Sequence, residues 1–291
     1  MNKIIGIDAG CTKMLMTAKW DGKYIDKTVP TGLEVTPEYL KDEIFAFIDS
    51  LPFVPEAIGM GVVGLVEDNT LKISHLRHLC GMKAAYFNTE NYKAYFINDV
   101  KAAMVYEEQF YKEDITFALI MAGSGFAMSV RTEGVNVLGQ NGWAGELGSN
   151  PYPINGGVEG LNEISGGNGI LNKAGCGIGE LLTALDNNEK FAIDVIEQAG
   201  FYFGLALSDV IHTFNPEYIV VGGSTATFKG YMDKAIAVAK QYTLTAMFNN
   251  CKIVTPRDAK RIVALGAIKF AQIQAASLSN GKCHETTSVK N

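Results

Sequence analysis

The residues nearest the start of the chain could bind a phosphate group. An apolar stretch over 4–7 runs directly into a turn that carries Asp8, Gly10 and Thr12. Gly10 lets the backbone approach an anion, Thr12 offers a hydroxyl, and Asp8 could hold a magnesium ion directly or through water. The same pattern also fits a plain hairpin with local turn hydrogen bonds. The complete turn consists of Asp8, Gly10, Cys11, Thr12 and Lys13.

A second glycine turn lies about one domain later in the chain. Gly123, Ser124 and Gly125 follow an apolar stretch over 115–121. Two backbone amides and a hydroxyl at this point could bind another phosphate, and an ordinary hairpin turn is the alternative. Two phosphate turns in separate halves of the chain favour a nucleotide held between two lobes.

A glycine pair, Gly222 and Gly223, ends a third apolar stretch over 218–221. A diglycine lets a flat ring approach the backbone, so an adenosine site is one interpretation and a tight strand-to-helix turn is the other. His212 lies just before this stretch on an apolar helix. We interpret it as a core or helix-end residue rather than a metal ligand, because no second ligand is close in sequence.

Asn98 and Asp99 follow the stretch 94–97 and open a predicted helix over 101–109. Asn and Asp are preferred helix N-caps, so a structural role is one interpretation. A carboxylate at the carboxyl end of a strand, where α/β sheets bind ligands, is also well placed to act as a general base for a hydroxyl. Asn98 could cap the helix while Asp99 does the chemistry.

Strand-like and helix-like segments alternate along the chain, which predicts mixed sheets covered by helices. The same order of segments occurs twice, which predicts two similar sheets. The segment 142–179 holds 12 glycines in 38 residues, so we expect a loop-rich insertion without regular elements. Expected strands are 4–7, 14–20, 23–29, 57–63, 94–97, 115–121, 126–131 and 218–221, and expected helices are 37–49, 101–109, 193–213 and about 264–280.

Composition excludes several functional classes. The 291 residues suffice for about two domains, and no apolar run approaches the roughly 20 residues of a membrane span. The net charge is −6 without a basic stripe, which argues against a nucleic-acid surface. The five cysteines are never closely paired, so we expect reduced, mainly buried thiols. The chain starts without a leader pattern, so a cytoplasmic protein is expected.

The order of motifs along nearly the whole chain resembles the ROK family of sugar kinases, repressors and open reading frames. This order is far more specific than any single motif. The motifs are Asp8-Ala-Gly-Cys-Thr12, Gly59-Met-Gly-Val-Val-Gly64, Asn98-Asp99, Gly123-Ser-Gly125, Ala144-Gly-Glu-Leu-Gly148, Asn215-Pro-Glu217 with Gly222-Gly223, and Ala264-Leu-Gly-Ala267.

The resemblance implies an α/β fold of the actin-like ATPase superfamily, with two lobes of ribonuclease-H-like topology and a ligand cleft between them. The expected lobes are 1–112 and 113–263, the second larger and carrying the insertion 142–179. The helix at about 264–280 would pack back on the first lobe. A homodimer is also expected, since family members are commonly dimers.

The resemblance also implies roles for individual residues. Asp99 is the expected catalytic base, and Glu146 and Glu163 are expected to bind sugar hydroxyls. ATP and magnesium are the expected cofactors, with the two glycine turns holding the phosphates. The expected acceptor-binding residues are Gly64, Asn98, Asp99, Glu146, Ser149 and Glu163.

Several positions depart from the family pattern. In many ROK kinases a His after the Ala-Gly-Glu-x-Gly motif and three nearby cysteines bind a structural zinc. This chain has Ser149 at that position and no Cys over 152–163, so no zinc site is expected there. Cys11 replaces a Gly of the first turn, and Val63 replaces the Pro usual before Gly64. These changes leave the identity of the sugar open.

The sequence thus predicts an ATP-dependent sugar kinase that phosphorylates a hexose, an N-acetylhexosamine or a close analogue. A catalytically weak sugar-binding sensor derived from a kinase is one alternative, because Ser149 and Cys11 depart from the pattern. A chaperone-like or scaffold ATPase of the same superfamily is another. The repressor branch is disfavoured, because its members carry an N-terminal DNA-binding helix-turn-helix and this chain starts at its first strand.

Overall fold

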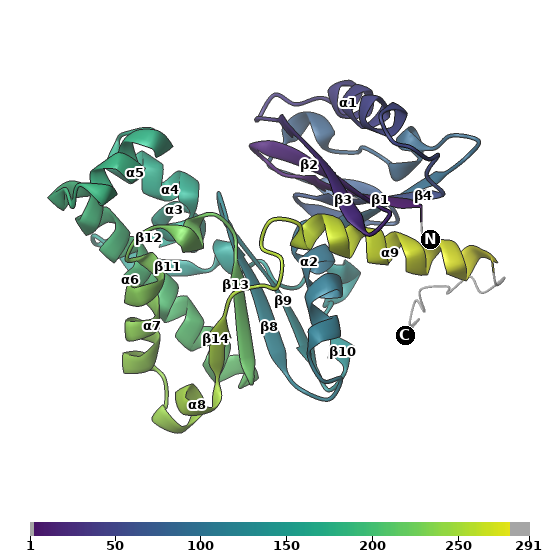
Figure 1. Ribbon diagram of the computed structural model, residues 1–291. Coiled ribbons are helices and arrows are strands. Elements are labelled where there is room, and N and C mark those ends of the chain that lie inside the picture. The colour runs from purple at the N-terminus through teal and green to yellow at the C-terminus, as the bar shows by residue number, and fades with distance from the viewer. Residues whose placement is uncertain (1–2, 280–291) are drawn as a thin grey trace. The chain divides into compact units, whose positions relative to one another are not determined.

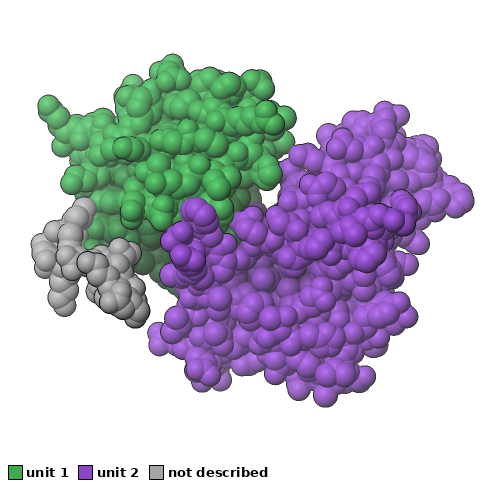
Figure 2. All heavy atoms as spheres, turned by 180° about the vertical axis from the view of Figure 1, so that it is seen from behind, with its two compact units in different colours: residues 1–109, 260–291 green, residues 110–259 purple. Residues whose placement is uncertain are grey.

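The computed structural model describes residues 3–279, which form two compact units (Figures 1 and 2). Of the described residues, unit 1 comprises those up to Gln109 together with those from Lys260 onward, and unit 2 comprises Phe110–Ala259. Within the described residues, no helix is long and apolar enough to cross a membrane.

Unit 1 is built on a five-stranded sheet with the order β3-β2-β1-β4-β7. β1, β2 and β3 form an antiparallel meander, whereas β1, β4 and β7 run parallel. The strands are β1 (Ile4–Ala9), β2 (Lys13–Trp20), β3 (Lys23–Pro30), β4 (Ala57–Val62) and β7 (Lys93–Asn98), with a separate hairpin of β5 (Leu65–Glu67) and β6 (Thr70–Ile73).

One face of this sheet is covered by α1 (Pro37–Asp49), as the sequence predicts. Thr36 caps the helix by accepting the Tyr39 N–H at 3.3 Å, and Pro37 occupies the first turn, where its missing N–H is harmless. Leu40, Ile44 and Phe47 recur at helical spacing and are buried with the apolar side chains of β1 and β2.

The other face packs against α9 (Ile262–Ser279), with α2 (Asp99–Glu107) beside it (Figure 1). The α9 helix approaches the sheet so closely that the contact points on the strands have no room for a side chain. A Cβ on Gly6 would lie 2.0 Å from the Ala264 carbonyl oxygen, and one on Gly59 would lie 1.9 Å from that of Ala267. The Gly59 and Ala264 motifs are therefore packing motifs. Residue 280, the end of the predicted helix, lies outside the described residues.

Unit 2 repeats the same strand order, β10-β9-β8-β13-β14, with β8 antiparallel to β9 and parallel to β13. The repetition predicted by the segment pattern is confirmed. The strands are β8 (Phe117–Ala122), β9 (Phe126–Thr132), β10 (Val135–Asn136), β13 (Tyr218–Gly222) and β14 (Lys252–Val254). The longer helices are α6 (Lys190–Phe214) and α7 (Tyr231–Tyr242), followed by α8 (Thr245–Asn250).

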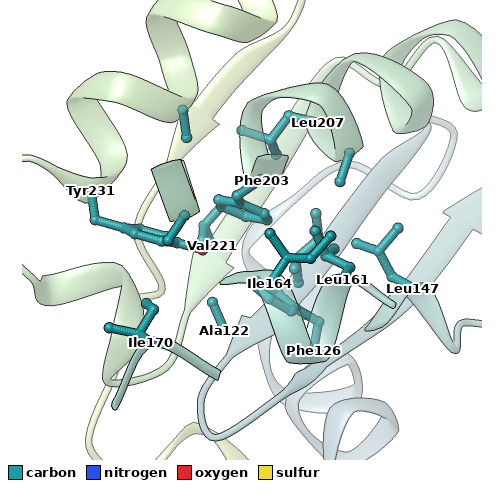
Figure 3. Close-up of a cluster of buried hydrophobic side chains, with 14 of the residues drawn as sticks. Ala122, Phe126, Leu147, Leu161, Ile164, Ile170, Phe203, Leu207, Val221 and Tyr231 are labelled. Atoms are coloured by element: carbon teal, nitrogen blue, oxygen red, sulfur yellow. The ribbon is translucent and has the colours of Figure 1, made fainter. Parts of the chain in front are cut away.

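The core of unit 2 joins one face of its sheet to α6 and the neighbouring helices (Figure 3). Phe203 of α6 stacks on Phe126 of β9 and on Tyr231 of α7, with ring centroids 5.1 and 5.6 Å apart. The Tyr231 hydroxyl is satisfied in this apolar setting, because it lies 2.6 Å from Ser165 Oγ. The start of β9 is thereby held firmly.

Two expectations about the chain are wrong. The glycine-dense segment 142–179 is not a structureless insertion. It contains β11 (Pro151–Ile154), β12 (Gly157–Gly160), α3 (Leu161–Ser165), α4 (Gly167–Ala174) and the start of α5 (Ile178–Asp186). Its glycines serve turns, as at Gly156 with φ +79°, and close contacts between elements. The described cysteines are also not mainly buried: Cys80 is exposed and the other three are half-buried.

Candidate active site

The first glycine turn is a hairpin that connects β1 to β2 in unit 1. The Gly10 N–H donates to the Lys13 carbonyl at 3.1 Å, and the Thr31 hydroxyl donates to the Gly10 carbonyl at 2.8 Å. A Cβ on Gly10 would lie only 3.0 Å from the Lys13 oxygen, so the turn has little room for a side chain. Thr12 and Lys13 are exposed and Cys11 is half-buried. The hairpin and the phosphate interpretations are therefore compatible.

The strand register brings the predicted residues of unit 1 to one edge of its sheet. Ala9 is level with Val62, and Val62 is level with Asn98, so the parallel strands β1, β4 and β7 end together. Gly64 follows β4 and Asp99 follows β7. The Asn98 side-chain amide donates to the Gly64 carbonyl at 2.9 Å, which ties the two strand ends to each other. This edge is where α/β sheets bind ligands.

Asn98 caps α2, as the sequence predicts, and Asp99 is the next residue along the chain. Asn98 Oδ1 accepts the Lys101 N–H at 3.2 Å and so caps α2, and Asn98 is buried. Asp99 is the first residue of α2, half-buried, with Oδ1 accepting the Val100 N–H at 2.8 Å. The helix therefore begins at Asp99, two residues earlier than predicted.

Asp8 lies in an environment that disfavours its charge. Burial, followed by the negative charge of Asp99, raises the pKa of Asp8 from 3.8 to about 7, and Lys13 offsets this only in part. Two carboxylates that repel each other at a sheet edge are a suitable setting for a hard divalent cation, which takes oxygen ligands. The residues present thus fit a magnesium ion held by Asp8.

The second glycine turn, in unit 2, is the hairpin between β8 and β9. The Gly123 carbonyl accepts the Gly167 N–H at 2.9 Å and the Thr225 hydroxyl at 2.7 Å. A Cβ on Gly123 would meet no atom within 4 Å, whereas one on Gly125 would lie 2.7 Å from Asn162 Oδ1. Neither glycine has a positive φ, so the requirement for glycine here is not one of backbone torsion.

The glycine pair after β13 lies beside this second turn. Gly222 is level with Met121 in the parallel pairing of β13 and β8. Gly223 has a φ of +96°, and a Cβ there would lie 2.2 Å from the Ala122 carbonyl oxygen. Thr225, in the short 3-10 helix that follows, forms the bond to Gly123. The structure therefore brings these two predicted nucleotide-binding segments together.

The predicted acceptor carboxylates lie on two connected segments of unit 2. Glu146, Ser149 and Glu163 are all exposed. The Ser149 N–H donates to the Glu146 carbonyl at 3.0 Å, which closes a 3-10 turn. The Leu161 N–H donates to the Asn150 carbonyl at 3.0 Å, so the segment before Glu163 is tied to the end of this turn.

The core anchors each of these segments through an apolar neighbour (Figure 3). Leu147 follows Glu146, Leu161 lies two residues before Glu163, and Ile164 directly follows Glu163. In the same way Phe126 follows the second glycine turn and Ala122 precedes it. The exposed Glu146 and Glu163 are thus each held in place by a buried apolar neighbour in the chain.

The predicted site residues fall into two sets, one in each unit. Sequence reasoning missed Thr31, Asn162 and Thr225, which hold the turns through bonds to residues 21 to 102 positions away. His212 is structural, as predicted: its Nε2 accepts the Leu244 N–H at 3.1 Å. Within residues 3–279, no group of three or more His, Cys, Asp and Glu side chains could hold a metal ion.

Two units that repeat one mixed five-stranded topology, each with a glycine turn after its first strand, define a two-lobe α/β fold of the actin-like type. The chain belongs to the ROK family, whose model matches residues 4–274. This confirms the family identified from the order of motifs.

Individual relatives agree with this assignment. The N-acetylmannosamine kinase of Shigella flexneri is 26% identical over 250 residues, covering 79% of this chain and 85% of the relative. The structure of a ROK glucokinase from Streptomyces griseus, in complex with glucose and AMPPNP, aligns with a TM-score of 0.79 and 18% identity over 93% of this chain and 99% of that one. A ROK transcriptional regulator, described as a homologue of E. coli MLC, aligns with a TM-score of 0.76 and 19% identity over 95% of this chain and 80% of that one.

Proposed function

We propose that this protein is an ATP-dependent carbohydrate kinase that transfers the γ-phosphoryl group to a hydroxyl of a hexose, an N-acetylhexosamine or a close analogue. The observation that carries the proposal is the sheet edge of unit 1, where Asp99 opens α2 beside Asp8, whose pKa is raised by burial and then by the charge of Asp99. A general base and a cation ligand are two of the groups that such a transfer uses.

Asp99 accepts the proton of the attacking hydroxyl, because its carboxylate is held at the start of α2 and Asn98 supplies the cap in its place. The backbone amides of the turns at Gly10 and at Gly123 bind phosphate oxygens. Asp8 would hold magnesium, which neutralises charge on the phosphates. Phosphoryl transfer depends mainly on such positioning and charge stabilisation.

Glu146 and Glu163 orient the acceptor by accepting hydrogen bonds from sugar hydroxyls, with Ser149, Gly64 and Asn98 completing the acceptor set. Gly222 and Gly223 lie beside the second turn, where a Cβ would meet Met121 or the Ala122 backbone, and this closely packed segment lies against the adenosine ring. The two domains are the N-terminal lobe, 1–112, on which the C-terminal helix packs, and the larger C-terminal lobe, 113–263. The protein works in the cytoplasm as a homodimer, without zinc and without nucleic acid.

A screen of ADP release tests the proposal. The purified protein is incubated with magnesium, ATP and one of glucose, N-acetylglucosamine, N-acetylmannosamine, fructose, glucosamine or a cyclitol. We expect one acceptor to raise ADP release well above the acceptor-free rate and to yield a sugar phosphate. ATP turnover indifferent to every acceptor would instead support a scaffold or chaperone-like ATPase.

A sugar-binding sensor is the second candidate. The exposed Ser149 stands where many ROK kinases have His, and a regulator of the same family shares the fold. Calorimetry distinguishes the two candidates: a sugar that binds without any ATP-dependent product supports the sensor.

A further inference from the structure

Asn162, in α3, lies between the second glycine turn and the turn that carries Glu146 and Ser149. Its Oδ1 accepts the Phe126 N–H at 2.7 Å, immediately after Gly125. The same amide faces Gly148, where a Cβ would lie 2.0 Å from Oδ1 and 2.7 Å from Nδ2. One half-buried side chain thus touches both segments.

The two glycines are explained by this amide rather than by backbone torsion. Neither Gly125 nor Gly148 has a positive φ, and the atoms nearest to a Cβ at either position all belong to the Asn162 side chain. The side chain therefore occupies the space that two other residues would fill. A shift of Asn162 would move both turns, because each packs directly against it.

The backbone around Asn162 extends the connection. The Asn162 carbonyl accepts the Gly166 N–H at 3.0 Å, and the next two N–H groups, of Gly167 and Asn168, donate to the carbonyls of Gly123 and Ser124 at 2.9 and 3.1 Å. Glu163 is the adjacent residue in the same short helix. The phosphate turn, the Glu146 turn and Glu163 are therefore joined through one residue.

We infer that Asn162 is a positioning residue that holds the phosphate turn and the acceptor carboxylates of unit 2 in a fixed mutual geometry. The inference rests on the proposed function for the roles of these segments. Asn162 itself need not touch either substrate. Its effect on the reaction comes from the precision with which it places Gly125, Glu146 and Glu163, and small misplacements of reacting groups reduce rates strongly.

Asn162→Ala tests this inference against a matched control, Ser165→Ala. Ser165 lies in the same helix and bonds the Ala199 carbonyl and Tyr231, but it contacts neither turn in the bonds described. We expect Asn162→Ala to raise the KM for ATP and the KM for the acceptor by about 5-fold to 10-fold and to lower kcat by about 10-fold. Ser165→Ala should lower the melting temperature by at least as much while leaving both KM values within about 2-fold.

A double-mutant cycle tests the contact itself. Gly148→Ala should reduce kcat/KM by about 10-fold or more in the wild-type background, because its methyl group collides with the Asn162 amide. In an Asn162→Ala background the collision is absent, so adding Gly148→Ala should cost less than about 2-fold. Independent, multiplicative effects of the two substitutions would overturn the inference.

Binding of a non-hydrolysable ATP analogue, measured by calorimetry, keeps the inference separate from the proposed function. If the wild type forms a sugar phosphate and Asn162→Ala has unchanged kinetics, the inference fails and the kinase proposal stands. If no sugar is phosphorylated but Asn162→Ala still weakens analogue binding by about 5-fold while Ser165→Ala does not, the kinase proposal fails and the positioning role stands. If the wild type binds no analogue, both fail.

Discussion

Asn98 and the proposed base Asp99 are neighbours at one strand-to-helix junction. Asn98 caps α2 and donates to Gly64, while the Asp99 carboxylate accepts the Val100 N–H at 2.8 Å. Because the cap comes from Asn98, a substitution of Asp99 that keeps a side-chain oxygen should preserve the fold. The two roles are therefore separable by mutation.

Asp99→Asn should abolish most turnover while preserving the fold. The amide keeps the shape of the side chain but cannot accept the hydroxyl proton, so we expect kcat to fall by about 10²-fold or more. The melting temperature and the affinity for an ATP analogue should stay close to the wild-type values. Near-normal turnover in this variant would eliminate Asp99 as the base.

Asp8 should lower the stability of the protein above neutral pH. Burial and then Asp99 raise the pKa of Asp8 from 3.8 to about 7, so between these values the folded state binds a proton that the unfolded chain has lost. The free energy of unfolding therefore falls as the pH rises through this window, and the loss persists above it.

Asp8→Asn removes this effect. Without magnesium, we expect the variant to exceed the wild type at pH 8 by on the order of 1–2 kcal/mol of unfolding free energy, and to match it near pH 4. Thermal or urea denaturation at the two pH values measures the difference. If the variant is less stable than the wild type at pH 8, the raised pKa of Asp8 does not destabilise the folded protein in this way.

At the scale of elements, the second glycine turn separates two reasons for the presence of glycine. Gly125 is confined by Asn162, whereas Gly123 has no protein atom close to where its Cβ would lie. The packing of the chain therefore does not explain the absence of a side chain at Gly123, and we expect the bound phosphate to require it.

Gly123→Val should weaken ATP binding without destabilising the protein. Gly177→Val is the matched control, since a Cβ there also meets no atom within 4 Å and neither residue has a positive φ. We expect the affinity for an ATP analogue to fall by about 10-fold or more in Gly123→Val alone. If calorimetry shows that the two variants bind the ATP analogue with equal affinity, the phosphates do not bind at Gly123.

The hairpin of β11 and β12, in the segment where no zinc site is expected, is held by side-chain hydrogen bonds with α6. The Tyr152 hydroxyl donates to Asp209 Oδ2 at 2.6 Å, and the Tyr202 hydroxyl donates to the Pro153 carbonyl at 2.8 Å. Burial, together with Asp209, raises the pKa of Tyr152, so the hydroxyl remains a donor.

Zinc should therefore be dispensable. We expect elemental analysis to find far less than one zinc per chain, and a chelator that spares magnesium to leave melting temperature and activity unchanged. Tyr152→Phe should lower the free energy of unfolding by about 1 kcal/mol, because the Asp209 bond is lost. Stoichiometric zinc that survives dialysis would contradict the prediction.

At the scale of the whole molecule, the chain leaves unit 1 after Gln109 and returns to it at Lys260. Asp26 of β3 fixes the returning segment: its carboxylate accepts hydrogen bonds from Arg261 at 2.8 Å, from Lys260 at 2.6 Å and from Thr17 at 3.1 Å. Burial disfavours the charged form, but these bonds outweigh it and lower the pKa of Asp26. The α9 helix thereby starts from a fixed point.

Asp26→Asn should lower the free energy of unfolding at pH 7 by about 1 kcal/mol. Because the pKa of Asp26 is lowered on folding, its contribution is present above about pH 4 and is lost as the pH falls through the lowered value. The difference between variant and wild type should therefore shrink in acid. Asp194→Asn, which breaks the exposed Lys190 pair, should leave the stability close to that of the wild type and serves as the control.

Local sequence determined the elements of this protein and the positions of its glycine turns. Thr36 and Pro37 start α1, short apolar runs form the central strands, and the repeated order of segments predicts two similar sheets. These features depend on neighbours a few positions apart, so they can be read from the sequence alone. The order of motifs was enough to identify the family.

Tertiary structure alone decided what supports the site. Asn162 reaches Phe126 across 36 positions and Thr225 reaches Gly123 across 102, and no periodicity signals such contacts. The glycine-dense segment illustrates the same limit: its composition indicates loops, but Gly148 and Gly166 are required by close packing between short elements. A glycine chosen for lack of space and one chosen for flexibility look identical in a sequence, and only the neighbours brought in by folding distinguish them.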